Sequence, residues 1–436
     1  MDLPGTASQL PFPHLPLHPH RPESRVWTVM LLLGTCLLYC ARVTVPICAV
    51  ALSSYFDWDK KQSGVVLSSF FWGYCLTQII GGHISDQIGG EKVLLLSASA
   101  WGFLTVLTPV LTHVTSAHLV FMTSSRFLMG LLQGEYCTPA TSFSFLVVRV
   151  SGWGRPVNPN GFPCRTLVIG GAGSLLLDWY GWESVFYFSG LLTLLWVYCT
   201  CKYLLSEKEL IIPIDYLTRG LSIPKQTKVP WKQLFRKAPI WAVIIAQLST
   251  ASTFFTLLSW LPTFFKETFP ESKGWVFNVV PWLVAIPTSL FSGFLSDHLI
   301  SQGYRTITIR KFMQVIGSGV SSVFALCLGQ TSSFCRAIVF ASASVGLQTF
   351  NHSGISVNVQ DLAPSCAGLL FGKDSVGFPC WRGVICVYLA GYLIETTGSW
   401  ISVFNLVAAV NSIGLCVFLL FGEAQRVDTD SAYVDL

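Results

Sequence analysis

The chain has 436 residues, of which 52% are hydrophobic and only 11% are charged. A soluble globular domain has about 25% charged residues, so this composition excludes one and indicates a polytopic membrane protein. The net charge of +5 comes without a basic cluster on a soluble domain, which excludes nucleic acid as a partner.

The predicted elements are membrane-spanning helices. Residues 1–25 are rich in proline and histidine and are expected to form a disordered cytosolic tail. Because about 20 helical residues cross the hydrocarbon core of a bilayer, the apolar runs that follow predict ten spans. These runs cover residues 27–51, 64–82, 93–112, 119–145, 184–205, 240–265, 275–295, 312–330, 334–356 and 401–422.

Two shorter apolar runs, Thr166–Leu177 and Gly383–Ile394, stand where the fifth and eleventh spans of a twelve-span protein belong. The predicted fold is therefore an all-α membrane protein with twelve helices in two six-helix bundles, in which helices 5 and 11 are atypical. The predicted domains are the N-terminal tail, an N-terminal bundle, a cytosolic central loop, a C-terminal bundle and a cytosolic tail (1–25, 26–205, 206–238, 239–422 and 423–436).

Two short motifs recur in the second half of the chain, in the same order. Gly82-x-x-x-Asp86 returns as Gly293-x-x-x-Asp297, so both members are 211 residues apart. Trp182-Glu183-Ser184-Val185-Phe186 returns as Trp400-Ile401-Ser402-Val403-Phe404, 218 residues further on. Repeats of this kind indicate duplicated halves. In membrane proteins, duplicated halves are typical of secondary transporters, whose substrate site lies between them.

The central loop sets the predicted topology. From Lys202 to Lys237 it carries eight lysines and arginines against three acids. Since positively charged loops stay in the cytosol, this loop is predicted to be cytosolic. A cytosolic N-terminus then requires an even number of preceding spans, so Thr166–Leu177, extended upstream, is predicted to cross the membrane. The C-terminal tail is then cytosolic as well.

Two arginines stand inside predicted spans, Arg42 in the first and Arg126 in the fourth. An ionisable group inside a span costs about 2.5–3.5 kcal/mol on insertion, so each is a candidate functional residue. Arginine stays charged and presents a planar fork of donors that suits a carboxylate or a phosphate. Arg126 lies near the start of its run, where snorkelling to the membrane surface is an alternative. The first three spans hold no deep acid, which favours an anionic ligand over a structural ion pair.

Asp86 and Asp297 are predicted to lie at the cytosolic face of the membrane, at matched positions of the two halves. A carboxylate there can cap a helix N-terminus or pair with a nearby base. We therefore predict conformational gating roles, rather than substrate contact, for both motifs. Their residues are Gly82, Asp86, Gly89, Gly293 and Asp297.

Few other residues suggest chemistry. Glu135 could couple protons near Arg126, although the irregular sequence that begins there explains it as well. Asn358 follows the tenth run, where it could bind a ligand or cap a helix. The 14 cysteines have no metal-ligand or disulfide spacing, and no nucleophile–base pair or phosphate loop occurs. We therefore expect a transporter without enzymatic activity, cofactor or metal.

The motifs carry a family resemblance. Gly82-x-x-x-Asp86-x-x-Gly89 resembles the signature loop of the major facilitator superfamily. The run Ser68-Ser69-Phe70-Phe71-Trp72-Gly73-Tyr74 resembles the second span of the solute carrier 17 group of organic-anion transporters. Trp260-Leu261-Pro262 and Asn358-x-x-Asp361 fit the same group. The likeness covers nearly the whole chain and is strongest to the branch that carries nucleotides.

The resemblance implies a carrier that loads nucleotides into secretory vesicles or lysosomes by alternating access, driven by membrane potential. By position, Arg42 and Arg126 match the anion-binding arginines of the group, and Tyr74 matches a tyrosine that lines the site. Gln133 stands where glutamate carriers have a glutamate, which argues against glutamate as the substrate. The likeness also implies chloride as an activator and functional coupling to a vesicular proton pump. It leaves the oligomeric state open.

Two alternatives remain. A proton-coupled lysosomal transporter of sialic acid, another monocarboxylate or phosphate would need a membrane-embedded acid, for which Glu135 is the candidate. The other alternative is a transport-inactive member of the family, because Glu135–Thr166 and Lys373–Arg382 depart from the pattern of the group. The C-terminal Tyr433-Val434-Asp435-Leu436 resembles an endosomal sorting signal and fits either compartment.

Overall fold

The computed structural model describes residues 22–88, 90–114, 116–150, 165–202, 236–362 and 377–424. The elements of these residues are helices, and where consecutive helices continue one another they form twelve crossing segments, which confirms the predicted fold class. Most of the predicted N-terminal tail, central loop and C-terminal tail lies outside the described residues.

The N-terminal bundle contains the first six segments. They are α1 (Pro22–Phe56), α2 (Lys60–Ile88), α3 (Gly90–Val114), α4 (His118–Val150), the continuous run of α5 (Arg165–Val168), η2 (Ile169–Gly173) and α6 (Ser174–Tyr180), and α7 (Trp182–Thr200).

The C-terminal bundle contains the other six. They are α10 (Ala238–Thr268), α11 (Gly274–Ser301), the run of α12 (Thr306–Gln314), η4 (Val315–Val320) and α13 (Ser321–Gln330), the run of α14 (Phe334–Gln348), η5 (His352–Ser356) and α15 (Val357–Leu362), α17 (Gly377–Thr397), and α18 (Ile401–Phe421).

Length and composition explain why these helices suit a bilayer. Six of the described helical segments contain an apolar window long enough to cross a membrane, and Val384–Thr397 is a shorter apolar helix. The fifth segment runs unbroken from Arg165 to Tyr180, about 24 Å at 1.5 Å per residue. It packs against α1 of its own bundle and against α11 of the other, so it lies at the interface between the two bundles. The eleventh segment, α17, is a single helix of 21 residues.

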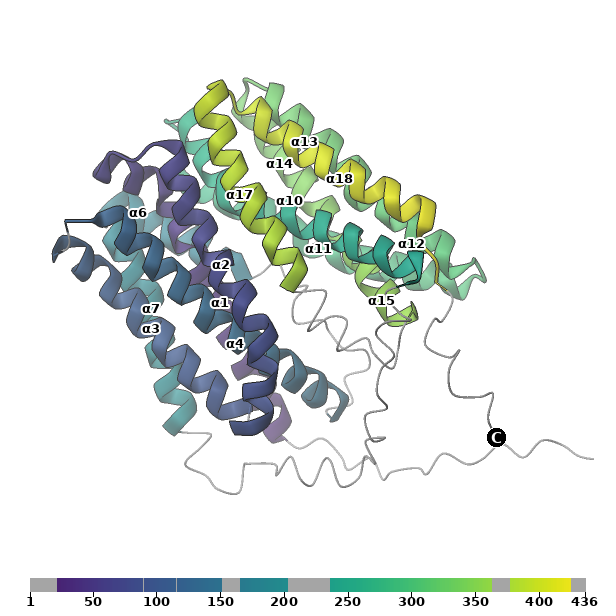
Figure 1. Cartoon of the computed structure of the whole chain (residues 1–436), viewed down its shortest axis with the longest axis horizontal. Helices are drawn as coiled ribbons and strands as arrows, with labels where there is room; N and C mark the ends of the chain where they lie inside the picture. The colour runs from purple at the N-terminus through teal and green to yellow at the C-terminus, as the bar shows by residue number, and fades with distance from the viewer. Residues whose placement is uncertain are drawn as a thin grey trace, which may run out of the picture.

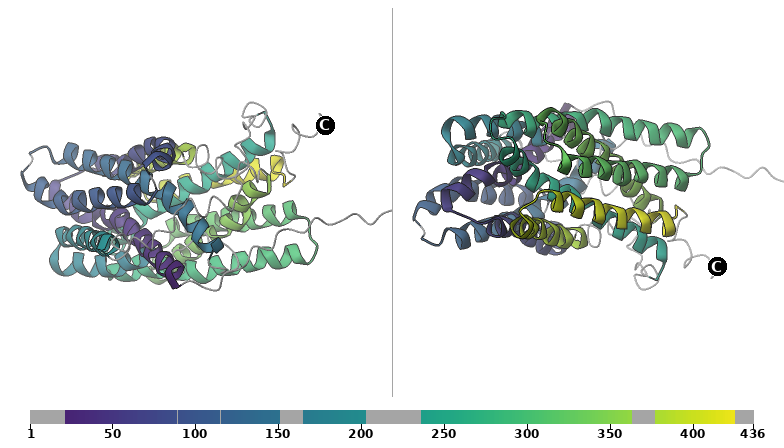
Figure 2. Two further views of the ribbon diagram at one scale, coloured as in Figure 1. Left: turned by 90° about the horizontal axis from the view of Figure 1, so that it is seen from below. Right: turned by 90° about the horizontal axis from the view of Figure 1, so that it is seen from above.

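The two bundles lie close together at one end and diverge toward the other (Figure 1). The helices of each bundle run roughly side by side in both further views (Figure 2). We call the converging end the short-loop end; there the connections are residues 57–59, 115–117, 181, 269–273, 331–333 and 398–400. The connection 302–305 lies at the other end, which we call the opposite end.

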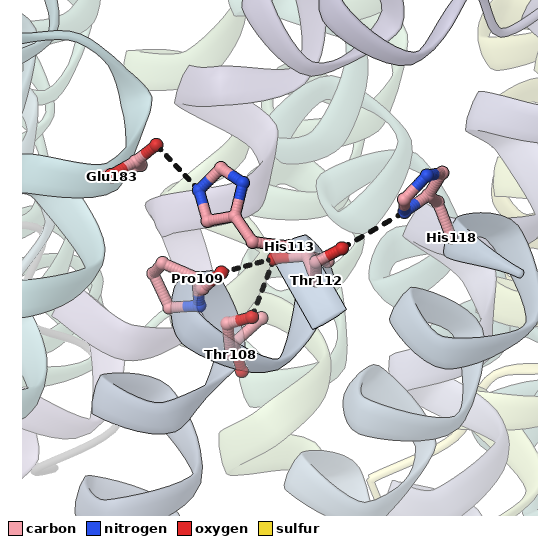
Figure 3. Close-up of polar contacts among 6 residues, drawn as sticks. All are labelled: Thr108, Pro109, Thr112, His113, His118 and Glu183. Atoms are coloured by element: carbon pink, nitrogen blue, oxygen red, sulfur yellow. Dashed lines mark hydrogen bonds and ion pairs between the residues drawn. The ribbon is translucent and has the colours of Figure 1, made fainter. Parts of the chain in front are cut away.

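Polar contacts hold three helices of the N-terminal bundle together at the short-loop end (Figure 3). His113 at the end of α3 lies with its Nε2 2.9 Å from Glu183 Oε1 on α7. His118 at the start of α4 lies with its Nδ1 3.1 Å from the carbonyl oxygen of Thr112. Thr112 donates in turn to the carbonyls of Thr108 and Pro109 within its own helix. These contacts tie α3, α4 and α7 into one unit.

A buried arginine ties the C-terminal bundle together near the opposite end. Arg310 on α12 donates its Nε to Asp361 Oδ2 on α15 at 3.0 Å. Its Nη1 donates to Ser296 Oγ on α11 and to the carbonyl oxygen of Ser353 in η5. One side chain therefore joins three segments of this bundle.

Candidate anion-binding site

Arg42 lies in the middle of α1 and is buried, with only 4% of its surface exposed. Its Nε donates to Gln133 Oε1 on α4 at 3.3 Å. Its guanidinium carbon lies 4.9 Å from the ring centroids of Tyr39, Phe70 and Tyr74. Cations are attracted to aromatic faces at such distances, so the three rings stabilise the charge and fix its position.

Arg126 on α4 is also buried, with 3% of its surface exposed, so its side chain does not snorkel to the membrane surface. Its Nη2 donates to the carbonyl oxygen of Arg42 at 3.1 Å, and its guanidinium carbon lies 5.0 Å from the Phe70 centroid. Its Nε is buried without a hydrogen-bond partner, and within the described ranges it forms no ion pair. A buried donor without a partner favours the binding of an acceptor.

Close packing of α2 against α4 brings these groups together. A Cβ atom on Gly73 would collide with the backbone of Phe127, and one on Gly130 would collide with the backbone of Phe70. Only glycine at both positions allows this approach, a device common where transmembrane helices touch. The contact places the rings of Phe70 and Tyr74 beside the arginines of α1 and α4.

The structure thus gathers four of the five residues predicted to bind substrate. Arg42, Arg126 and Tyr74 meet as described, and Gln133 links α4 to α1 because its Nε2 donates to the carbonyl oxygen of Leu38 at 3.3 Å. Asn358 lies elsewhere. It is buried in α15, near the opposite end, where its Nδ2 donates to the carbonyl oxygen of Glu423.

The predicted gating residues are only partly described. Gly82 and Asp86 lie in the last turns of α2, whose side chains from Gln78 onward fall outside the description, and Gly89 lies outside it altogether. Gly293 and Asp297 lie on α11, where a Cβ on Gly293 would meet no atom within 4 Å and the side chain of Asp297 is exposed. Their gating role stays a prediction.

Charged contacts between the bundles were missed by the sequence analysis. At the short-loop end, Lys60 Nζ pairs with Glu267, and the Lys60 backbone N–H donates to Glu395 Oε2 at 3.0 Å. On the other side of the interface, Lys266 Nζ lies 3.9 Å from Asp178 Oδ1. Each contact joins one bundle to the other. They were missed because single charges at span ends look like ordinary solvated loop residues.

A second set of contacts between the bundles lies deeper. Asn278 on α11 donates its Nδ2 to Ser174 Oγ on α6 at 2.9 Å. A Cβ on Gly170 would lie 2.5 Å from the carbonyl oxygen of Asn278. Both these contacts and the charged ones lie in the half of the molecule next to the short-loop end, so the bundles are closed against each other on that side.

Partly exposed side chains lead from the opposite end toward the arginines. On α1 they end at Tyr39, beyond which every side chain from Cys40 to Ala49 is buried. On α10 they include Gln247, Thr250 and Phe254, one face of the helix, and every side chain from Thr256 to Leu261 is buried. The glutamine and threonine suit water rather than lipid. The site is therefore approached from the opposite end.

Comparison with known proteins identifies the family of the chain. A family model described as Major Facilitator Superfamily matches residues 31–378. The chain is 63% identical over 418 residues to the human voltage-gated purine nucleotide uniporter SLC17A9, covering 95% of this chain and 96% of that protein. It is 64% identical to the rat protein of the same name, covering 95% and 93%. The chloroplastic ascorbate transporter of Arabidopsis thaliana is 30% identical, covering 92% and 76%.

Solved structures with the same fold are transporters of low sequence identity. The bacterial homologue of the human lysosomal transporter Spinster, inward-facing and occupied, superimposes with a TM-score of 0.63 at 14% identity, covering 92% of this chain and 97% of that one. The inward-open xylose transporter XylE from E. coli gives a TM-score of 0.67 at 11% identity, covering 91% and 96%. These likenesses support the fold alone.

Proposed function

The chain belongs to the major facilitator superfamily, and we propose that it carries purine nucleotides such as ATP, ADP and GTP into secretory vesicles or lysosomes by alternating access. Its similarity to the mammalian purine nucleotide uniporters supports the substrate class. The observation that carries the proposal is the pair Arg42 and Arg126, two buried guanidinium groups that both lie within 5.0 Å of the Phe70 centroid.

Two neighbouring cations inside a membrane favour a ligand with several negative charges. Like charges repel more strongly in a medium of low dielectric constant, and an anion between them converts this repulsion into attraction. Phosphate groups also match the donor fork of arginine. A nucleoside di- or triphosphate therefore fits the site better than a monocarboxylate, which brings a single charge.

The membrane potential alone is sufficient as a driving force. A charge that crosses 100 mV gains about 2.3 kcal/mol, so a nucleotide with about four negative charges gains about 9 kcal/mol on entering a positive lumen. A thousandfold concentration gradient costs about 4 kcal/mol. The proposal thus includes uniport without protons, a vesicular proton pump as the source of the potential, and chloride as an activator.

The orientation is also part of the proposal. We place both termini and the opposite end in the cytosol and the short-loop end in the lumen, following the positive charge of the central loop. The structure then corresponds to a state that receives cytosolic substrate, with the lumenal side closed by the contacts of Lys60 and Lys266.

Uptake into proteoliposomes tests the function. Labelled ATP is offered under an inside-positive potential without a pH gradient, and separately under a pH gradient without a potential. We expect uptake in the first condition and only background in the second.

The other outcomes identify the rival functions. Uptake of sialic acid or phosphate that follows the pH gradient would contradict the proposal in favour of a proton-coupled carrier. Correct membrane insertion without uptake of any anion would show a transport-inactive member of the family.

A further inference from the structure

We propose that Phe254 stacks against the purine base of the nucleotide while Arg42 and Arg126 hold its phosphates, and that Trp282 fixes the ring of Phe254 in place. This inference rests on the proposed function, because it adds to the same site a residue that selects the base.

Aromatic rings connect the arginines with the C-terminal bundle. The ring of Phe70, which lies 4.9 Å from the guanidinium carbon of Arg42, contacts Phe71 at a centroid distance of 5.2 Å. Phe71 on α2 then contacts Phe255 on α10 at 4.5 Å. This ring pair crosses from one bundle to the other, so two ring contacts connect Phe255 of α10 with Phe70 beside the arginines.

Phe254 continues this series on α10. Its ring meets Phe255 at 5.6 Å and Trp282 on α11 at 5.8 Å, with interplanar angles of 67° and 79°. Both neighbours are thus edge-to-face, an arrangement that holds the ring at a fixed tilt. Among the described residues, no aromatic ring stacks in parallel on Phe254, so its ring has no stacked partner in this part of the chain.

The accessible face of α10 ends at this ring. Gln247, Thr250 and Phe254 are partly exposed on one face of the helix, and every side chain from Thr256 to Leu261 is buried. Phe255 is also partly exposed, but its ring packs against Phe71 of α2. A substrate that enters along this face therefore meets Phe254 as the deepest accessible ring of α10 that is not in contact with the other bundle. On α1, Tyr39 is likewise the last partly exposed residue before a buried stretch, and its ring already lies against Arg42.

A purine base is the part of a nucleotide that suits such a ring. Every base has a π-face, and its stacking on an aromatic side chain needs no hydrogen-bonding partner. The two fused rings of a purine cover more of a phenylalanine than the single ring of a pyrimidine. The geometry therefore predicts a preference for purines over pyrimidines without strong discrimination between adenine and guanine.

Proteoliposome uptake with Phe254→Ala tests the inference, because loss of the ring should affect the base and spare the phosphates. We expect the KM for ATP to rise at least about fivefold, equivalent to about 1 kcal/mol. The ratio of the KM for UTP to that for ATP should fall toward one. Inorganic tripolyphosphate should still compete with ATP. Its inhibition constant, which is the half-inhibiting concentration corrected for the change in KM, should stay within about twofold of the wild-type value.

Matched variants separate stacking from packing. Phe254→Trp keeps an aromatic face and should retain the KM for ATP and the purine preference. Phe294→Ala removes a ring that is 68% exposed on α11 and should leave all three readouts unchanged. Thermal unfolding of each purified variant confirms that it is folded.

Several results would overturn the inference. They are an unchanged KM for ATP in Phe254→Ala, an unchanged UTP-to-ATP ratio, or an equal loss of ATP and tripolyphosphate affinity. Failure of tripolyphosphate to compete in the wild-type protein would also refute a phosphate subsite that is separate from the base. If wild type takes up no nucleotide, the proposed function itself fails, which distinguishes the two cases.

Discussion

Neutral groups help to fix the position of the Arg42 side chain. The side-chain oxygen of Gln133 accepts from its Nε, and the rings of Tyr39, Phe70 and Tyr74 surround the guanidinium carbon. Amide and aromatic groups orient a cation without cancelling its net charge. The arginine thus stays attractive to an anion and needs little rearrangement on binding, which lowers the cost of association.

A carboxylate in place of the amide should compete with the substrate. In Gln133→Glu, the new carboxylate forms an ion pair with Arg42 at nearly the same geometry. We expect the KM for ATP to rise about tenfold, equivalent to about 1.4 kcal/mol, as measured by uptake at neutral pH. Gln133→Met, similar in size but uncharged, should raise KM less. An equal KM in Gln133→Glu and wild type would show that Arg42 does not face the substrate.

For single residues, the sequence predicts which side chains have a function better than it predicts their neighbours in the fold. A charge inside an apolar run indicates function because burial is costly, which is why Arg42 and Arg126 could be identified. The neighbours of each arginine depend on which helices pack together. Here the glycine contacts between α2 and α4 bring the rings of α2 to both arginines. Asn358 was assigned to the site although its neighbour is Glu423, since spacing along one helix does not reveal what lies across from it.

The fifth segment makes a close contact between the bundles. Its π-helical stretch η2 presents Gly170 to the backbone of Asn278 on α11, while a Cβ on the adjacent Gly171 would have its nearest neighbour at 3.6 Å. The two glycines share one element and one interface but differ in the space around them.

These neighbours form a matched pair of variants. Gly170→Ala should push α11 away and weaken closure at the short-loop end, so the rate of ATP uptake should fall at least about threefold, because interior contacts this tight tolerate little added volume. Gly171→Ala should transport like wild type. Equal rates for both variants in the proteoliposome assay would mean that this contact does not control closure.

Most elements could be predicted from the sequence because each apolar run is long and contains few charges. The fifth segment was harder, since a 12-residue run is too short to distinguish a span from a buried helix. The structure extends it to Tyr180 by including Asp178 and Trp179, residues that hydropathy alone excludes. Asp178 has a partner in Lys266, and a contact of that kind depends on the tertiary fold.

For the molecule as a whole, the contacts at the short-loop end indicate that one side must open during transport. The ion pairs of Lys60 and Lys266 are partly exposed, so each contributes little to stability and can be broken and formed again. The deeper contacts through Asn278 and Gly170 provide shape complementarity. A covalent bond at this interface should therefore trap the closed state.

A cysteine pair tests this. A Cβ on Gly274 would lie 3.4 Å from the Cβ of Ser174, just below the range of about 3.5–4.5 Å that disulfides adopt, so a small backbone shift permits the bond. Ser174→Cys with Gly274→Cys should crosslink under mild oxidation and lose ATP uptake, and a reductant should restore it. Each single variant under the same oxidant is the control. Full uptake by the crosslinked protein would contradict opening at this end.

The most direct test of the account is equilibrium binding of ATP to the purified protein, which requires neither a gradient nor a complete transport cycle. We predict that wild type binds ATP and that Arg42→Ala and Arg126→Ala each weaken binding at least about tenfold, or about 1.4 kcal/mol. Arg305→Ala, which removes an exposed arginine from the 302–305 connection, should bind like wild type. Unchanged ATP affinity in both Arg42→Ala and Arg126→Ala would contradict the claim that these buried cations hold the substrate.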